Sequence, residues 1–263
     1  GLKYDFSKGK SHKVSANRIF NSSYRPFTKS NAYFDRPLNN NVGQNYNLFP
    51  DQNSKNLFIS VTGVGSRNGL STLMSDVITD LNMLEAGAQC FPLNLYEEQE
   101  TDGLFSKESG LGKYLVTDGI SENGLQHFLD AYSGEKFTKE DLFYYIYGLL
   151  HSTDYRERFQ NNLSKELPRI PAVKKFKDFM TFSKAGRKLG DLHINYETVE
   201  PYPVTFKEGD LRLADTSDPK SFYRVKKMKF ASKQGKSTVI YNNNITMQNI
   251  PLEAYDYVVN GKP

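Results

Sequence analysis

The sequence predicts an α+β fold in which β-rich N- and C-terminal parts flank a helical middle at about residues 121–194. Two patterns lead to this prediction. Short apolar runs bounded by turn residues occur before and after the middle, and such runs are typical of strands. Within the middle, apolar residues recur at helical spacing and follow capping residues. A chain of 263 residues can form one large domain or two small ones with a real core.

The chain can be divided into a β-rich part at 1–116, a helical part at 117–194 and a second β-rich part at 195–263. In the first part, residues 18–35 predict two short strands around a turn at Arg25-Pro26. We expect residues 38–55 to form a loop, because they are rich in Asn, Gln and Gly.

Further strands are expected before the helical part begins. Residues 57–62 are mostly apolar and predict a buried strand. Residues 74–84 predict another strand, with Phe91-Pro92-Leu93 following it. The acidic, glycine-containing stretch at 97–113 predicts a mobile surface loop.

The helical part is expected to contain several helices. Residues 121–132 carry apolar side chains at helical spacing. Thr138 and Asp141 fit a capping box, which predicts that an aromatic, largely buried helix begins there. Asp154 is expected to cap the next helix, which Pro168 would end.

A last helix is predicted at residues 173–194, with one basic face. Strands are expected to return at 204–206, 222–231, 237–247 and 254–262. The three consecutive asparagines within 237–247 predict a loop or bulge.

The distribution of charge points towards polyanions. The net charge is only +4, but positive residues gather at 1–47, 156–188 and 221–236, and the last of these stretches contains no acid. Clusters of Lys and Arg suit phosphate backbones, because binding releases the counterions of the nucleic acid. The alternative is that these residues form an ordinary solvated surface.

The glycine-rich segment at 63–71 does not have the spacing of a nucleotide site. Gly63 and Gly65 are followed by Gly69, one residue too late for the dinucleotide pattern, and neither GKS triplet in the chain has the first glycine of a phosphate-binding loop. We expect either a plain turn between strands or a loop whose backbone N–H groups and Arg67 approach a DNA phosphate.

No catalytic constellation is recognisable. The four histidines lack metal-ligand spacing, and Cys90, the only cysteine, resembles a core residue. Asp76, Asp80 and Glu85 lack the neighbouring lysine of a metal-dependent nuclease. No apolar run is long enough to span a membrane, and we expect a cytoplasmic location.

Several blocks of sequence are distinctive enough to indicate a family. They are Tyr24-Arg25-Pro26-Phe27 with Ala32-Tyr33-Phe34-Asp35, Gln89-Cys90-Phe91-Pro92-Leu93, and Tyr145-Ile146-Tyr147-Gly148-Leu149-Leu150-His151-Ser152 with Tyr155-Arg156 and Glu166-Leu167-Pro168-Arg169-Ile170-Pro171. Together they resemble the C-terminal specificity region of type ISP single-polypeptide restriction–modification enzymes, which methylate adenine at N6. The resemblance runs from about residue 18 to 260. Thr28 departs from it, since family members often have an acidic residue there.

The resemblance implies that residues 1–263 are a target-recognition domain, which clamps double-stranded DNA together with the methyltransferase domain of the same polypeptide. The nuclease, helicase-like ATPase and methyltransferase would precede Gly1, so we expect a non-catalytic, excised piece of a longer chain. S-adenosylmethionine, ATP and Mg²⁺ would serve the parent chain, an adenine methyltransferase and ATP-dependent endonuclease. No cofactor or metal is expected in this piece.

Arg and Lys suit guanine edges and phosphates, and Asn suits adenine edges, so residues of these types are the predicted DNA contacts. They are Arg25, Lys29, Arg67, Lys226, Lys227, Lys229, Lys233, Lys236, Asn242, Asn243 and Asn244. Arg156 and Arg169, in the helical block, are interpreted as structural residues. The main alternative is a methyltransferase-docking or oligomerisation module that reads no DNA; an RNA-binding module and a nucleotide-binding enzyme domain are the others.

Overall fold

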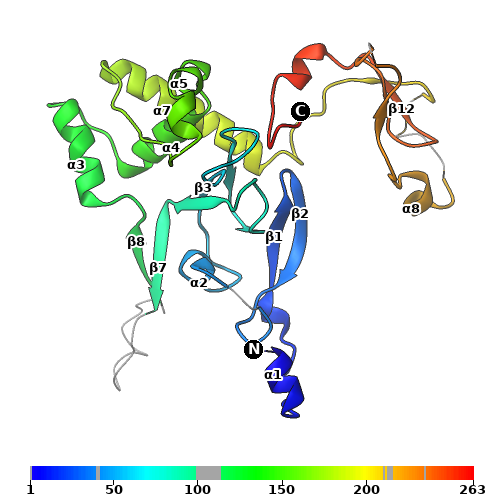
Figure 1. Cartoon of the computed structure of the whole chain (residues 1–263), viewed down its shortest axis with the longest axis horizontal. Helices are drawn as coiled ribbons and strands as arrows, with labels where there is room; N and C mark the ends of the chain where they lie inside the picture. The colour runs from blue at the N-terminus through cyan, green and yellow to red at the C-terminus, as the bar shows by residue number, and fades with distance from the viewer. Residues whose placement is uncertain (1, 40–41, 99–113, 210, 212–215, 234) are drawn as a thin grey trace. The chain divides into compact units, whose positions relative to one another are not determined.

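The computed structural model describes residues 2–39, 42–98, 114–209, 211, 216–233 and 235–263 (Figure 1). The chain separates into two compact units, at residues 1–197 and 198–263. The fold is α+β, as predicted. The division of one recognition domain into a β-rich, a helical and a second β-rich part, which was drawn from the sequence, stays a prediction.

The first unit begins with the short helix α1 and a β-hairpin. The predicted strand pair is confirmed: β1 and β2 are antiparallel, with Phe20 opposite Ala32, and the turn between them contains Pro26. The predicted loop at 38–55 holds one short helix, α2. The elements are α1 (Leu2–Ser7), a 3-10 turn (Ala16–Arg18), β1 (Ile19–Arg25), β2 (Thr28–Tyr33) and α2 (Asn45–Leu48).

A three-stranded antiparallel sheet of order β4-β3-β6 lies at the centre of the first unit. Its strands are β3 (Phe58–Val61), β4 (Thr72–Ser75) and β6 (Gln89–Pro92). Every residue of β3 and β4 is buried. The predicted buried strand at 57–62 and the strand at Phe91 are therefore confirmed.

The single strand predicted at 74–84 is wrong. β4 ends at Ser75, and β5 (Ile78–Thr79) pairs with β1 in another sheet. The break arises because the Ser75 hydroxyl donates to the Val77 carbonyl over 3.0 Å and accepts from the Val77 amide over 3.3 Å. This turn passes the chain from one sheet to the next.

The strands β7 (Asn94–Glu98) and β8 (Tyr114–Asp118) form a two-stranded antiparallel ribbon. The predicted mobile loop at 97–113 is thus partly strand at its start, because Glu97 and Glu98 pair with Leu115 and Tyr114. Residues 99–113 lie outside the described residues.

The helical part contains α3 (Glu122–Ala131), α4 (Lys139–Leu150), α5 (Thr153–Arg158), α6 (Gln160–Leu163) and α7 (Phe176–Ile194). The predicted capping box is confirmed, with Thr138 and Asp141 exchanging bonds at the start of α4. Asp154 is not the cap of the next helix. Ser152 is, because its hydroxyl accepts from the Tyr155 amide, and that helix ends well before Pro168.

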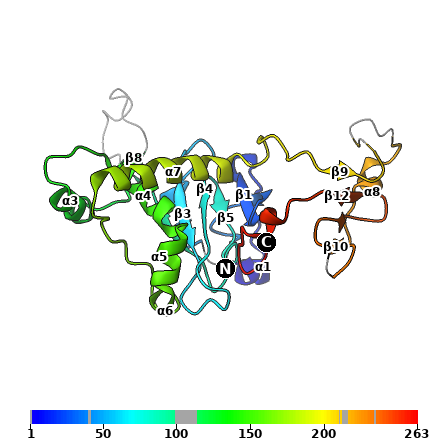
Figure 2. The ribbon, with the colours of Figure 1, turned by 90° about the horizontal axis from the view of Figure 1, so that it is seen from above.

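Helices α4 and α7 pack with their backbones in near contact. A Cβ at Gly148 would lie 2.3 Å from the Phe182 carbonyl oxygen, and a Cβ at Gly186 would lie 2.0 Å from that of Tyr144. Only glycine fits at this crossing. Figure 2 shows α7 running across the sheet, and it contacts β4. The main core lies between the helices and the sheet, and a smaller core around Phe20 and Phe58 lies under the hairpin.

The second unit is a small antiparallel sheet of order β10-β11-β12-β9 with short helical turns. Its elements are β9 (Thr205–Phe206), α8 (Pro219–Phe222), β10 (Lys229–Phe230), β11 (Val239–Ile240), β12 (Thr246–Gln248) and a 3-10 turn (Leu252–Tyr255). In the described part of this unit, the buried hydrophobic side chains are those of Val239 and Ile245.

Two strand predictions for the second unit need correction. Within 222–231 only Lys229 and Phe230 form a strand. Residues 254–262 form no strand; the chain makes a tight turn in which Val259 and Lys262 form an isolated bridge. The turn arises because Asn260 and Gly261 both adopt left-handed backbone conformations, with φ of 52° and 72°.

Candidate nucleic-acid interface

The predicted DNA contacts are divided between the two units. Arg25, Lys29 and Arg67 belong to the first unit. The predicted lysines and asparagines belong to the second: Lys226, Lys227, Lys229, Lys233, Lys236, Asn242, Asn243 and Asn244. In each unit, some of these side chains are exposed, and others form contacts with neighbouring residues of the protein.

Arg25 at the end of β1 is held by the fold. Its guanidinium lies 2.9 Å from the Asp80 carboxylate, donates to the Asn82 carbonyl over 3.3 Å, and stacks 4.2 Å from the centre of the Tyr24 ring. The Asp80 amide also donates to the Ser23 carbonyl. Arg25 therefore ties the hairpin to the segment after β5, and a DNA contact would have to compete with this ion pair.

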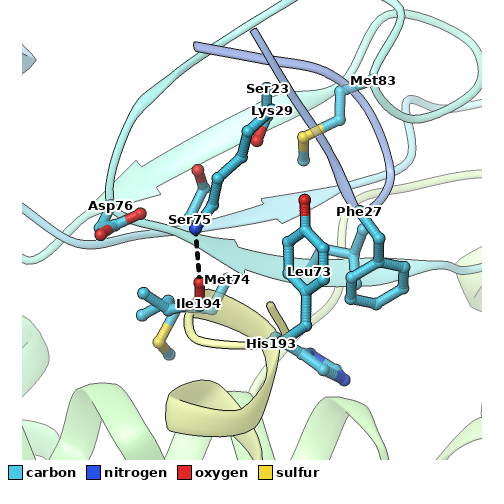
Figure 3. A pocket seen from close by; sticks show the side chains of 11 residues that line it. Ser23, Phe27, Lys29, Leu73, Met74, Ser75, Asp76, Met83, His193 and Ile194 are labelled. Atoms are coloured by element: carbon cyan, nitrogen blue, oxygen red, sulfur yellow. Dashed lines mark hydrogen bonds between the residues drawn. The ribbon is translucent and has the colours of Figure 1, made fainter. Parts of the chain in front are cut away.

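The tip of the hairpin is fastened to the C-terminal end of α7. Phe27, with φ of 52°, packs edge-on against His193 and Tyr196. Lys29 donates to the Ile194 carbonyl over 3.0 Å (Figure 3). Its ammonium also lies 3.4 Å from the Glu197 carboxylate. A lysine at the last carbonyls of a helix is favourable for the helix dipole. Lys29 thus has a structural role in this unit.

A small pocket lies under this junction, lined by side chains of the hairpin, of β4 and of the end of α7 (Figure 3). Its volume is about 20 Å³, which is room for about one water molecule and not for a ligand. Beside it, the Tyr147 hydroxyl contacts His193 Nδ1 and accepts from the Met74 amide over 2.9 Å. Burial lowers the pKa of His193 to about 4. The His193 ring is therefore uncharged at neutral pH and serves packing.

Arg67 stands on a loop that is built around a carboxylate. Glu85 accepts from the Ser66 hydroxyl over 2.9 Å, from the Asn68 amide over 3.2 Å and from the Asn68 side chain over 2.9 Å. The bond from Ser66 is the main cause that lowers the pKa of Glu85. Arg67 itself is exposed and forms no ion pair with the residues that the structure describes.

Glycines make this loop possible. Gly65 and Gly69 have φ of 85° and 73°, which other residues rarely adopt. A Cβ at Gly63 would lie 1.9 Å from the Ala86 carbonyl oxygen, since the loop packs against the chain next to Glu85. The glycines therefore serve a tight, fixed turn that presents one guanidinium to solvent. Arg67 differs from Arg25 and Lys29 in that its guanidinium forms no ion pair with the described residues.

The predicted lysines of the second unit are all exposed. Lys229 lies on β10 opposite Ile240. Lys236 lies 6.0 Å from the centres of the Phe230 and Tyr255 rings, and its carbonyl accepts from the Tyr255 hydroxyl over 2.7 Å. Exposed cations beside exposed aromatic rings can take phosphates and stack on bases.

The three asparagines occupy the loop between β11 and β12, as predicted, but their environments differ. The Asn242 side chain accepts from the Asn244 and Ile245 amides and donates to the Phe222 and Arg224 carbonyls. The Asn244 side chain also donates to Phe222. Asn243 is exposed at the tip. The geometry leaves Asn243 as the amide that is best placed to read a base edge; its role stays a prediction.

The helical block 138–171 is occupied by structural contacts. Arg156 donates to the Leu150 carbonyl over 2.6 Å at the end of α4, and Arg169 forms an ion pair with Glu166 over 2.9 Å. Tyrosine hydroxyls hold the connector that follows, with Tyr155 donating to the Arg169 carbonyl and Tyr145 to the Pro171 carbonyl. These contacts engage the polar groups of the block within the first unit.

An open groove of about 370 Å³ beside β1 was not predicted from the sequence. Asp51, Gln52 and Asp76 contribute to its lining, the first two from the segment after α2 and the third from the turn between β4 and β5. The Asp51 carboxylate accepts from the Asn53 amide and the Ser54 hydroxyl. Two carboxylates at one groove disfavour a phosphate there, so this groove is not assigned to the DNA backbone.

Among the described residues, no group of three His, Cys, Asp or Glu side chains is arranged to hold a metal ion. In the part of the chain that the structure describes, no helix has the length and apolar character needed to cross a membrane. Cys90 lies partly buried between Ser60 and Thr79, and burial raises the pKa of its thiol.

Comparisons with known proteins agree with each other. The family model of the Type ISP C-terminal specificity domain matches residues 1–263. The chain is similar to LlaBIII, an ATP-dependent Type ISP restriction-modification enzyme solved bound to DNA, with 33% identity and a TM-score of 0.80 over 100% of this chain and 16% of that one. A search of curated proteins finds no match.

Two other solved structures are similar over almost the whole chain. A nuclease-deletion mutant of the Type ISP enzyme LlaGI, in complex with a DNA substrate mimic, has 37% identity and a TM-score of 0.74 over 99% of this chain and 18% of that one. The DrdV–DNA complex has 29% identity and a TM-score of 0.79 over 98% and 24%. The chain therefore spans less than a quarter of the length of each of these three proteins.

Proposed function

Because this chain belongs to the family of Type ISP C-terminal specificity domains, we propose that it recognises a specific sequence in double-stranded DNA for a restriction–modification enzyme. The observation that carries the proposal is the likeness, over 98–100% of this chain, to three proteins that were solved with DNA or a DNA substrate mimic. The exposed cations support it, since both units present lysine or arginine side chains to solvent.

The two units suit different parts of this task. In the first unit, Arg67 is a single guanidinium on a fixed loop and fits a phosphate contact. In the second unit, Lys229 lies on β10, and Lys233 and Lys236 lie on the connection from β10 to β11, while the tip amide of Asn243 is available for an adenine edge. We assign backbone positioning to the lysines and base reading to the loop that carries Asn243.

We further propose that the chain acts within a longer polypeptide and has no catalytic role of its own. Its recognition would direct N6-adenine methylation, and ATP-dependent translocation and cleavage, by other domains of that polypeptide. S-adenosylmethionine, ATP and Mg²⁺ would be used there. The methyltransferase domain would be its partner in clamping the duplex, in the cytoplasm where the DNA lies.

Selection from a pool of randomised duplexes tests the proposal. The 263-residue chain is expected to enrich a shared motif. Asn243→Ala should change the preference at one position by about 1–3 kcal/mol, whereas Arg67→Ala should weaken binding to all duplexes alike. Binding without enrichment would contradict sequence reading, and competition by RNA as strong as by duplex would favour an RNA-binding module.

A docking or oligomerisation module is the second candidate. The second unit exposes large apolar side chains, with Tyr202 at 62%, Met228 at 56% and Leu252 at 60% of their surface. Such side chains are typical of surfaces that contact another protein domain. This function predicts that the chain binds no oligonucleotide even at low salt, while it binds the methyltransferase domain or itself.

A further inference from the structure

We propose that the outer face of α7 binds the phosphate backbone of the duplex through Lys177, Lys184 and Lys188, called here the lysine stripe. The inference rests on the proposed function and adds a surface to it. None of these residues was among the individual contacts expected from the sequence, although they lie in one of its basic stretches and on a helix predicted to have a basic face.

The three lysines form a straight line along the helix. They occupy positions i, i+7 and i+11, which lie within about 40° of each other on a helix of 3.6 residues per turn. The buried residues of α7 form a second line along the helix: Phe179, Ser183, Gly186 and Gly190. This line begins two residues after Lys177, and two residues correspond to a rotation of about 160° around the helix axis. The lysine stripe is therefore on the face of α7 opposite its packed side.

The lysine stripe is also electrostatically unopposed. None of its lysines forms an ion pair with any residue in the described ranges, and all are exposed. Arg187 on the same helix behaves differently: it pairs with Glu140 over 2.8 Å and Asp141 over 3.7 Å, and lies 4.0 Å from the centre of the Tyr144 ring. The helix thus separates one structural cation from three that face solvent.

Helix α7 also carries two acidic residues, Asp178 and Asp191, and only Asp191 lies on the face of the lysine stripe. Asp191 follows on the same face at the C-terminal end of the helix, where its carboxylate accepts from the Asn195 side chain over 2.8 Å. Asp178 is turned about 100° from Lys177 on the helix. Neither carboxylate forms an ion pair with a stripe lysine. The charge along the stripe is therefore positive over most of its length.

The support under the stripe is rigid. α7 is held against α4 by the Gly148–Gly186 crossing, against β4 by Gly190, whose Cα hydrogen faces Met74, and at its C-terminal end by Lys29. The stripe spans about 16 Å, at 1.5 Å per residue, which equals about five nucleotides of rise along one DNA strand. A straight, fixed row of flexible ammonium groups fits a regular polyanion, because each long stem can adjust to its own phosphate.

The experiment compares two triple variants of the 263-residue chain. One is Lys177→Ala with Lys184→Ala and Lys188→Ala; the control is Lys55→Ala with Lys136→Ala and Lys165→Ala, exposed lysines of the same unit that form no line on one helix. Both variants lose the same charge. Duplex binding is measured by fluorescence anisotropy over a series of salt concentrations, and folding is checked by thermal melting.

We expect the stripe variant to bind roughly tenfold more weakly than the control at low salt, with the salt-dependence slope reduced by about 2 to 3, since each phosphate contact contributes about 0.9. Equal binding by both variants would overturn this inference and leave the proposed function standing. Loss of methyltransferase-domain binding by the stripe variant alone, with unchanged DNA binding, would assign the stripe to a protein partner instead. Absence of DNA binding by the unaltered chain would overturn the proposed function and this inference with it.

Discussion

The two units of this protein are stabilised in very different ways. The first has interlocked helices, a fully buried pair of strands and a dense set of aromatic contacts around Phe179, which packs against Tyr132, Phe137 and Tyr145. In the second, the described strands have two or three residues each, and the loop is held by the side chain of Asn242. The first unit is therefore a scaffold whose shape depends on many groups. The second depends on few, and small sequence changes there can alter its loops without disturbing the scaffold.

The largest expected effect is on the first unit. Phe179→Ala removes a ring that is fully buried at the centre of the aromatic cluster, and it should lower the free energy of unfolding of this unit by about 3–5 kcal/mol. Urea unfolding followed by tyrosine fluorescence measures it. A loss below about 1 kcal/mol would mean that the cluster is not the main support of α7.

The second largest effect is expected from acid, which should lower the free energy of unfolding of the first unit. Burial lowers the pKa of His151 and of His193 to about 4, so the unfolded chain binds more protons than the folded one between about pH 4 and 6.5. Stability is then complete above pH 6.5 and falls as the pH decreases, by about 1.4 kcal/mol per histidine at pH 5.5. Denaturant titrations at pH 8 and 5.5 measure the loss. His193→Asn should remove about half of this dependence. An unchanged pH dependence in this variant would contradict the assignment.

A conservative change sharpens the comparison between the units. Ile245→Val deletes one methyl group from the small core of the second unit and should cost about 1 kcal/mol. Because that core is small, we expect limited proteolysis to cleave the second unit faster while the first stays intact. The matched control is Ile59→Val in β3, the same chemical change at a buried site of the first unit, and it should leave the cleavage pattern unchanged. Similar cleavage of both variants would show that the units do not differ in this respect.

The smallest effect is expected at the loop that carries Arg67. Glu85→Gln replaces an oxygen that accepts hydrogen bonds by a group that donates them, so the bonds from Ser66 and Asn68 weaken. Hydrogen exchange at the Asn68 amide should become faster, with no change in the melting temperature of the unit. Unchanged exchange would mean that the glycines alone fix the loop.

Much of the fold follows from local patterns in the sequence. The capping box at Thr138, the strand pair around Pro26 and the buried strand at 57–62 depend on neighbouring residues and were predicted. The break between β4 and β5 was not predicted. A serine can continue a strand or form a turn through its hydroxyl, and the sequence does not show which of these Ser75 does. In the second unit, apolar runs predicted strands that are short or absent, since little core exists to extend them.

The candidate site was harder to predict than the fold. Sequence shows which residues are cationic but not which cations are already paired. Arg25 meets Asp80, 55 positions away, and Lys29 meets Ile194, 165 positions away. Conversely, the lysine stripe becomes visible only when the buried face of α7 is known. Tertiary structure was therefore needed to separate engaged cations from accessible ones.

The carboxylate of Glu85 determines which groups of the glycine-rich segment at 63–71 stay available to a ligand. It sits where loop donors converge, and so it takes the place that a bound phosphate oxygen would occupy in a nucleotide-binding loop. The protein supplies its own internal anion, and these donors are already satisfied before any ligand arrives. A DNA strand that approached this loop would meet the Arg67 side chain, because the loop donors are already bonded to Glu85. The negative charge of Glu85 nearby would favour a phosphate contact at the far end of that side chain.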